Sequence, residues 1–442
     1  MASAPADGHF NPMTGVGKYL ESQGHDVRWY ATTHYADKIR QMEMHHYPFT
    51  VAKNFLASNI DTDFPERQHI KNPIKKINWD IEHFFIARGP EYLEDMKAIK
   101  QEFDFDVLLC DNGFTGAVFA KYELGVPIVV LSILPLTESS RDLAPYGLGL
   151  TPARSIAGRL FHSGLRWLAT NVLFKNSNKI LHEILNRYDI PHERLSVFDL
   201  VCKKADILLQ SGSPRFEYQR SDLSDNVRFI GGLLPYQPAN GKKQWFADKI
   251  TEYKNIVLVT QGTVEKDVSK LLVPALEAFK DDADTLLICT TGGSDTARLK
   301  KQYGQHNIII EDFIAFKDVM PFCDVYISNG GYGGVLLGIE HRLPLVVAGV
   351  HEGKNEICAR IGYFNYGVNL KTERPSPPQL RKAVNEVLMN PLYKNAVEHL
   401  AEELETYQPN QLVEQYIYEV LDRQPNKPST KTPVQVMAEM SI

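Results

Sequence analysis

The chain has 442 residues, which is too long for one compact core and fits two domains of ordinary size. Its hydrophobic content of 43% and charged content of 23% are those of a soluble globular protein. A net charge of −6 gives no electrostatic reason to bind nucleic acid or an anionic membrane. The longest mainly apolar run, residues 126–136, is well short of the ~20 residues that a bilayer span requires.

The cysteines indicate a reducing compartment. They are five in number, scattered through mainly apolar runs, and none forms a C-x-x-C pair. The amino terminus shows no basic segment ahead of an apolar core, so no signal peptide is visible. We therefore expect a cytoplasmic protein with reduced, buried thiols.

The first half predicts alternating strands and helices interrupted by two long inserts. Residues 1–35 predict a very short opening strand, a turn at residues 7–12, a helix ended by Gly24 and a strand at 27–30. Strands follow at 105–111 and 126–134 around a helix at 115–124, then a helix end and strand at 201–210, and 227–232 closes the half. The inserts, 43–104 and 135–173, carry amphipathic helical pieces (as at 79–85) or Gly, Pro and aromatic residues. Long inserts of this sort usually wall a binding cleft.

In the second half, predicted strands and helices alternate more regularly. Strands are expected at 256–260, 285–290 and 308–311, and helices at 267–280, 295–303, 377–389, 391–405 and 410–423. We therefore predict an amino-terminal domain at 1–234, a linker at 235–247, a second domain at 248–405, a terminal helix within 406–423 and a disordered tail at 424–442.

A glycine-rich stretch at 324–356 organises this second half. The apolar run 325–327 predicts a strand that is broken sharply by Ser328-Asn329-Gly330-Gly331. Helical spacing follows until Pro344, and a second strand is expected at 345–348. Glycines at a strand–helix turn let a ligand approach the backbone, and the N–H groups of the helix start then face an anion. The stretch therefore predicts a phosphate-binding site.

Two familiar phosphate motifs fail on spacing. A dinucleotide fingerprint read from Gly331 places Leu336 where its last glycine belongs. A P-loop read from Gly349 to Lys354 has one residue too few, and Asn355 replaces the Ser/Thr. Neither reading is retained.

The stretch resembles the donor signature of family 1 nucleotide-sugar glycosyltransferases, the UGT and macrolide type. In that family a Thr/Ser-His-Gly/Cys-Gly run, a G-V-P and a D-Q-x-x-N-A follow one another, and here residues 328–331, 342–344 and 351–356 take those places. The family's opening G-H-x-x-P and x-G-H-x-V are matched at 8–12 and 24–27. Over residues 3–423 the resemblance implies the α/β GT-B fold, two Rossmann-like domains facing a cleft. It also implies that the terminal helix packs back on the first domain.

The resemblance also implies a catalytic pair. His9 matches the family's general base, and Asp111 matches the carboxylate that orients it. Each residue falls just past a strand, where α/β sheets place their ligands, and a neutral imidazole suits proton abstraction near neutral pH. The alternative is that both residues merely cap helices.

The same resemblance supplies donor-binding candidates. Gly262 and Thr263 match a phosphate-contacting turn, Phe313 would stack on the nucleobase, and Ile314 would hydrogen-bond it through its backbone. The alternative for Phe313 is a core residue. A further glycine turn at 291–294 is either part of the site or a simple tight turn. The helix start and sugar-binding positions are Ser328, Asn329, Gly330, Gly331, Gly333, Gly334, His351 and Glu352.

Three positions depart from the family pattern. Asn329 stands where the family has a diphosphate-contacting histidine, and Leu337 where it has a ribose-binding carboxylate. His351-Glu352 replaces the Asp-Gln pair that grips the sugar, although Glu352 could still accept from sugar hydroxyls. Glu340 and Glu356 are near enough in sequence to take over the ribose contact.

The expected function is inverting transfer of a hexose, by default glucose, from a UDP-sugar to a hydroxyl of an apolar small molecule. No metal or other cofactor is expected, and no nucleic-acid partner. The alternatives are a nucleotide-sugar epimerase on the same fold and a non-catalytic or altered-specificity nucleotide-sugar binding protein.

Overall fold

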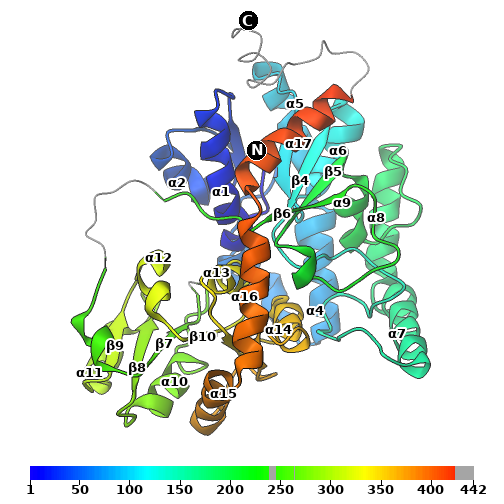
Figure 1. The fold of residues 1–442 in the computed structure, drawn as a ribbon. Coiled ribbons are helices and arrows are strands. Elements are labelled where there is room, and N and C mark those ends of the chain that lie inside the picture. Colours follow the sequence, from blue (N-terminus) through cyan, green and yellow to red (C-terminus); the bar gives the residue numbers. More distant parts are fainter. Residues whose placement is uncertain (238–244, 263, 424–442) are drawn as a thin grey trace, which may run out of the picture.

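The computed structural model describes residues 1–237, 245–262 and 264–423, and Figure 1 shows two sheet-centred halves. Parts of three sequence predictions therefore lie outside the described residues. These are the middle of the linker (238–244), Thr263 of the donor turn and the tail at 424–442.

The first half is built on parallel strands. Strands β3 (Leu108–Asp111), β4 (Ile128–Ser132), β5 (Ile207–Ser211) and β6 (Val227–Gly231) pair in that order, and β1 (Arg28–Ala31) pairs with β2 (His45–Pro48). Ala2 joins the two groups, because it bridges Tyr30 and Cys110 in parallel sense. The expected opening strand is thus represented by this single residue, which lies between β1 and β3.

Helix α1 (Asp7–Ser22) begins earlier than its sequence suggests. The turn expected at 7–12 is wrong, since His9 lies in the first turn of this helix. Pro12 suggested a turn, but the helix tolerates it. A proline in the second turn leaves only the Gly8 carbonyl without its helical partner. The negative charge of Asp7 at the helix start is favourable.

The two inserts contain more regular structure than expected. Strand β2 lies in the first insert, where no strand was predicted, and α7 (Ile156–Leu168) lies in the second, where no helix was predicted. The expected helical piece at 79–85 is a π-helix, η4 (Ile81–Ile86). The remaining helices of this half are α2 (Ala36–Gln41), α3 (Ile60–Asp63), α4 (Pro73–Asp80), α5 (Arg88–Glu102), α6 (Gly116–Leu124), η5 (Ala169–Leu173), α8 (Lys175–Arg187) and α9 (Val197–Lys204), with short 3₁₀ turns η1 (Thr33–Tyr35), η2 (Ala57–Asn59), η3 (Pro65–His69) and η6 (Pro214–Phe216).

The second half is one parallel sheet in the order β12-β11-β10-β7-β8-β9. Its strands are β7 (Asn255–Thr260), β8 (Thr285–Thr290), β9 (Ile308–Glu311), β10 (Val325–Ser328), β11 (Leu345–Val347) and β12 (Gly367–Asn369). The helices are α10 (Leu272–Phe279), α11 (Thr296–Gln302), α12 (Phe316–Val319), α13 (Tyr332–Glu340), α14 (Lys354–Tyr363), α15 (Pro377–Met389) and α16 (Pro391–Glu405), with 3₁₀ turns η7 (Asp248–Glu252) and η8 (Met320–Phe322). Helix α10 begins five residues later than the predicted 267. Alternate strand residues feed apolar clusters on both faces of the sheet.

The chain returns to the first half at its carboxyl end. In Figure 1 the orange α16 leads out of the second half, and the red α17 (Pro409–Asp422) lies against the first. Helix α17 packs on α1, where Glu414 accepts from Tyr19 Oη at 3.1 Å and contacts His25 Nε2 at 3.0 Å.

The carboxyl edges of the two sheets face one another. The Tyr332 hydroxyl at the start of α13 donates to the Ser211 carbonyl at the end of β5, at 2.6 Å. Glu356 of α14 accepts from the amides of Gly147 and Gly149 at 2.8 Å each. Because ligands of open α/β sheets bind outside the carboxyl ends of the strands, any site of either half opens toward the other.

Candidate active site

His9 and Asp111 meet at the carboxyl edge of the first sheet. His9 Nδ1 lies 2.5 Å from Asp111 Oδ2. The carboxylate is fully buried and also accepts from the amides of Ala4 and Gly113 at 2.6 Å each, whereas the imidazole is 20% exposed. Since Nδ1 donates to this carboxylate, the neutral ring carries its free electron pair on Nε2, as a general base requires.

The environment of His9 sets its protonation. Burial lowers the pKa of His9, but the charge of Asp111 and its hydrogen bond raise it, and the net result is a pKa above the ordinary 6.5. The pair lies at the topological switch point of the first sheet, where Ala2 stands between β1 and β3. The alternative, that His9 and Asp111 only cap helices, does not account for this contact.

Three strand ends of the second sheet share one type of hydrogen-bonded turn. The hydroxyls of Thr260 and Ser328, the last residues of β7 and β10, and of Thr291, just after β8, each accept an amide N–H at 3.2 Å from the glycine two residues further on. These glycines, Gly262, Gly293 and Gly330, all have positive φ, between 76° and 83°. Glycine turns of this kind bring backbone amides to the strand ends, which suits an anion. In the turn after β8 the amides of residues 291–294 all donate to protein oxygens, so the turns after β7 and β10 are the candidates.

The crevice between β7 and β10 is the switch point of this second sheet, because the chain turns outward in opposite directions from these two strands. Asn329 spans it, and its side-chain amide donates to the Gln261 carbonyl. Gly330 is required at the turn, since a Cβ there would lie 2.5 Å from Cys358 Sγ. Gly333, in the first turn of α13, has no atom near its Cβ position and leaves that helix start open.

Gly331 and Gly334 complete the helix start. Gly331 is the residue that precedes α13 in extended conformation, and Gly334 lies in its first turn beside Tyr326. Backbone N–H groups at such a start lack helical partners and favour an anion.

Phe313 is exposed and Ile314 is buried. The Phe313 ring is 69% exposed and lies within 4 Å of the Cβ position of Gly293, whereas Ile314 belongs to the core of the second half. The core alternative for Phe313 is therefore wrong, and a ring free for stacking stands next to the glycine turn at 291–294. Ser294 Oγ in that turn and Gln261 Oε1 are buried without a hydrogen-bond partner in the described structure.

The residues expected to hold the sugar lie on an exposed loop. His351 contacts Glu373 at 2.6 Å, and Glu352, at φ 57°, pairs with Lys354 Nζ at 2.6 Å. Sequence reasoning missed Lys354 as a site residue. Its Cβ lies 2.9 Å from the Cβ position of Gly349 and 3.7 Å from that of Gly330, so this cation borders the glycine turn.

Helix α14 offers no available carboxylate for the ribose hydroxyls of a donor. Glu356 is buried, with one oxygen held by two amides and the other 3.1 Å from Arg360 Nη1, so its proposed takeover of the ribose contact is wrong. Leu337 packs against the core of the second half. Glu340, one turn further along α13, stays available: burial raises its pKa to about 7, and its carboxylate packs on Gly232.

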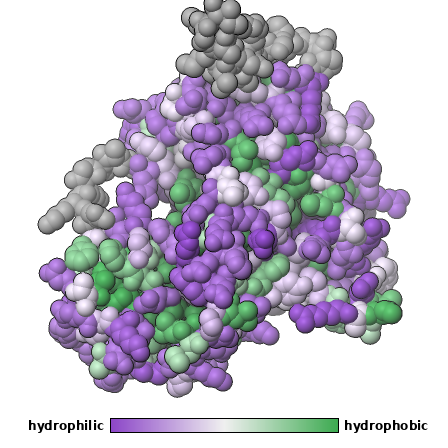
Figure 2. Space-filling model, viewed as in Figure 1, coloured by the Kyte–Doolittle hydropathy of each residue, from purple (hydrophilic) through white to green (hydrophobic). Residues whose placement is uncertain are grey.

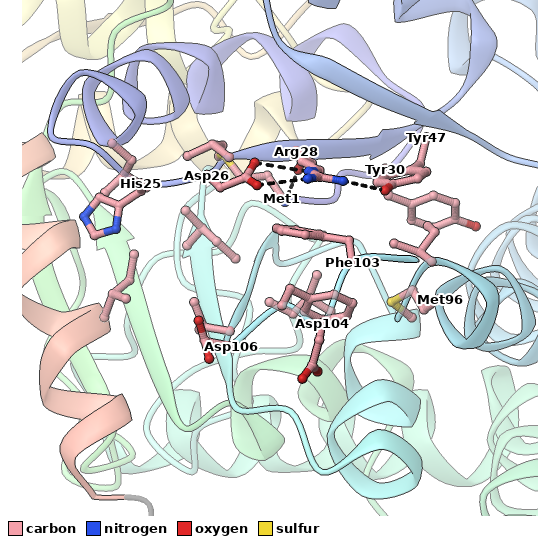
Figure 3. A pocket seen from close by; sticks show the side chains of 18 of the residues that line it. Met1, His25, Asp26, Arg28, Tyr30, Tyr47, Met96, Phe103, Asp104 and Asp106 are labelled. Atoms are coloured by element: carbon pink, nitrogen blue, oxygen red, sulfur yellow. Dashed lines mark hydrogen bonds and ion pairs between the residues drawn. The ribbon is translucent and has the colours of Figure 1, made fainter. Parts of the chain in front are cut away.

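A large cavity lies elsewhere in the first half. About 700 Å³ opens at the amino edge of the first sheet, beside Met1 and the starts of β1 and β3. Figure 3 shows Arg28 there, held by Asp26 and Tyr47, with its guanidinium 4.0 Å from the Phe103 ring centroid. This cavity lies at the opposite edge of the sheet from His9 and Asp111 and does not belong to their site.

Neither a metal site nor a membrane span is found in residues 1–237, 245–262 and 264–423. Within them, no cluster of three or more His, Cys, Asp or Glu side chains has the arrangement of a metal site. No helix there has the length and apolar character needed to cross a membrane.

Comparison with known proteins places this geometry in context. The family model described as "UDP-glucoronosyl and UDP-glucosyl transferase" matches residues 6–418. The chain is 33% identical over 404 residues to 4'-demethylrebeccamycin synthase of Lentzea aerocolonigenes, covering 91% of this chain and 94% of that protein. It is 29% identical over 440 residues to UDP-glucosyltransferase 1 of Beauveria bassiana, covering 94% and 93%.

Solved structures show the same fold. The glycosyltransferase of kitacinnamycin superimposes with a TM-score of 0.71 at 16% identity, covering 95% of this chain and 98% of that one. The calicheamicin glycosyltransferase CalG4 gives 0.70 at 16%, covering 96% and 98%. The expected GT-B arrangement of two Rossmann-like domains is thereby confirmed.

Proposed function

Because this chain belongs to the family of UDP-glucuronosyl and UDP-glucosyl transferases, we propose that it moves a hexose, by default glucose, from UDP to a hydroxyl of an apolar small molecule with inversion at the sugar carbon. The observation that supports this most directly is the His9–Asp111 contact at the switch point of the first sheet. The glycine turns at the opposing carboxyl edge supply the complementary anion site.

The chemistry assigns one role to each half. The acceptor oxygen forms a bond to the sugar's anomeric carbon while the bond from that carbon to the diphosphate breaks, and the leaving diphosphate keeps the electron pair. His9 Nε2 takes the acceptor proton, and Asp111 stabilises the imidazolium that results. The open start of α13 faces the charge that develops on the leaving group.

Donor recognition follows from the same geometry. Phe313 offers an exposed ring to the nucleobase, with Ile314 behind it in the core. Lys354 and the amides around Gly330 and Gly333 hold the diphosphate, and Glu352 accepts from sugar hydroxyls. No metal is expected, because these groups can neutralise the diphosphate. UDP should therefore raise the melting temperature equally with and without EDTA.

The decisive experiment is a donor panel with mass-spectrometric detection of products on phenol and terpenol acceptors, followed by NMR of the anomeric configuration. His9→Ala should lose about 10²–10⁴-fold in kcat. Asp111→Ala should lose a comparable factor, and the double variant should be little worse, because the two act as one unit. Retention of configuration, or a His9→Ala enzyme with near-normal turnover on an aliphatic alcohol, would overturn the proposal.

His25 provides a matched control. It also contacts a carboxylate, Glu414, at 3.0 Å, but at the amino edge of the same sheet. His25→Ala removes an imidazole–carboxylate contact without touching the proposed site. Turnover close to that of the unmodified chain is expected, whereas a loss equal to that of His9→Ala would show that histidine removal disturbs the fold.

A further inference from the structure

Helix α7 is an amphipathic helix whose apolar side is turned toward solvent. Ile156, Leu160 and Trp167 are 78%, 69% and 63% exposed. At about 3.6 residues per turn, these three side chains lie in one row along the helix. Phe161 and Leu168 are exposed beside that row. A surface helix normally turns such a stripe toward the core.

The opposite, more polar side attaches α7 to the protein. His162 is the one residue of α7 that is buried. Arg166 donates from its guanidinium to the Leu143 carbonyl. The orientation of α7 is thus inverted relative to an ordinary amphipathic helix, and its apolar side has no partner in the described part of the chain.

Helix α4 adds two exposed apolar residues beside η5, the segment that follows α7. Ile74 and Ile77 are each 49% exposed, and Asn78 Nδ2 donates to the Leu173 carbonyl at 2.9 Å, which holds α4 beside η5. Figure 1 places the free end of α7 at the lower right, and Figure 2 shows hydrophobic atoms gathered there beside hydrophilic ones. We call this surface the outer patch; it comprises Ile74, Ile77, Ile156, Leu160, Phe161, Trp167, Leu168 and Val172.

The charge around the outer patch is positive although the whole chain is negative. No Asp or Glu occurs between residues 143 and 182 or between 69 and 79. The basic residues in these two stretches are Lys71, Lys75, Lys76, Arg154, Arg159, Arg166, Lys175 and Lys179. Arg154, Arg159 and Lys175 are exposed and form no ion pair within the described residues. This local excess of positive charge is not apparent from the net charge of −6 of the whole chain.

We propose that the outer patch docks the protein on an anionic lipid bilayer, with α7 lying in the plane of the membrane interface. A helix with Trp, Phe and Leu on one side and basic residues beside them is the pattern of interfacial helices, which insert apolar side chains among the lipids while cations meet anionic headgroups. A second copy fits less well, because a two-fold contact would bring the same uncompensated cations against each other.

The test is flotation of the full chain with vesicles, without donor or acceptor, so the outcome is independent of glycosyl transfer. Vesicles of 70% phosphatidylcholine and 30% phosphatidylserine should carry the protein at low salt, and pure phosphatidylcholine should carry much less. L160S/F161S/W167S should abolish flotation. R154Q/R159Q/K175Q should weaken partitioning about 100-fold, at roughly fivefold per charge.

Controls separate docking from folding and from dimerisation. M389S/L392S removes two exposed apolar residues of α15 and α16, 83% and 50% exposed, and should float normally. Each variant should keep the UDP-induced thermal shift of the unmodified chain. Brominated lipid should quench tryptophan fluorescence in the unmodified chain and much less in Trp167→Phe. The proposal is overturned if the unmodified chain does not float with anionic vesicles, if the triple serine variant floats equally, or if the chain is a dimer that this variant splits and shows no flotation.

Discussion

At the scale of single residues, the contact between His9 and Asp111 combines two opposing influences on one imidazole. Burial disfavours the charged ring, and the adjacent carboxylate favours it more strongly. The same carboxylate fixes the tautomer, because Nδ1 must donate to it. Orientation and basicity of the proposed base therefore have one physical cause.

The pH dependence of transfer follows from the direction of this shift. The pKa of His9 is raised above 6.5, and the base acts only when neutral, so kcat/KM should fall on the acid side with a midpoint above 6.5. Asp111→Asn should move that midpoint downward while lowering the rate. A pH–rate profile of both proteins decides this, and an acid limb centred below pH 6 in the unmodified enzyme would contradict the assignment.

Lys354 gives a second residue-scale prediction. It borders the glycine turn, and its ammonium pairs with Glu352, which holds the cation beside the proposed diphosphate position. Lys354→Met should weaken UDP binding about tenfold to a hundredfold, as expected for a lost charge-assisted contact. Calorimetric titration of UDP measures it. Lys300→Met, at an exposed pair with Glu311, is the control and should bind UDP normally.

At the scale of elements, the recurring strand-end turn explains why the second sheet needs glycine where it does. A hydroxyl on the last strand residue, or on the one after it, accepts the amide N–H of the glycine two residues later. The chain turns at that glycine, whose φ is positive. Three parallel strands repeat this turn at one edge of the sheet, and the turns after β7 and β10 border the same crevice. The local sequence sets each turn, and the parallel sheet brings the turns together.

Two glycines of this region should respond differently to alanine. Gly330→Ala places a methyl group 2.5 Å from Cys358 Sγ at a positive φ, so it should lower the free energy of unfolding by about 1–3 kcal/mol. Gly333→Ala meets open space in a helix and should preserve stability or raise it by about 0.5–1 kcal/mol. Denaturant melts measure both.

UDP titration completes this comparison. Gly333→Ala should weaken UDP binding although the fold is intact, because its methyl group enters the open helix start. Equal UDP affinity for Gly333→Ala and the unmodified chain would place the diphosphate away from α13.

At the scale of the whole molecule, a buried ion network joins the halves. Arg360 of α14 lies 2.8 Å from Glu217, which follows β5, and 3.1 Å from Glu356 on its own helix. The three side chains are at most 6% exposed. The guanidinium also stacks 4.3 Å from the Tyr218 ring centroid. These contacts hold the two carboxyl edges, and hence the two parts of the site, opposite each other.

Removing the cation from this network should be costly. Among the described residues, Arg360→Met leaves the buried Glu356 without a cation and leaves Glu217 with only Arg220, 4.0 Å away. Breaking such a buried pair typically costs about 3–5 kcal/mol. Arg374→Met breaks an exposed pair with Asp267 and should cost at most about 1 kcal/mol. Denaturant unfolding of both variants gives the comparison. Equal stability of the two would show that the network does not hold the halves together.

The sequence by itself determined the family, the GT-B fold and most elements of the second half, because these depend on local spacing. Strand runs, glycine breaks and helix stops lie within a few residues of each other, and α15 and α16 occupy the residues expected for them. The resemblance of its motifs to the family also indicates the proposed His9–Asp111 pair.

Only the tertiary structure decided which groups meet and which sides face solvent. It assigned Glu356 to the contact between the halves, brought Lys354 beside Gly330 and exposed Phe313, since these outcomes depend on residues distant in the chain. It also turned the apolar side of α7 outward. Periodicity shows that a helix has an apolar side, but only packing shows whether the protein buries it.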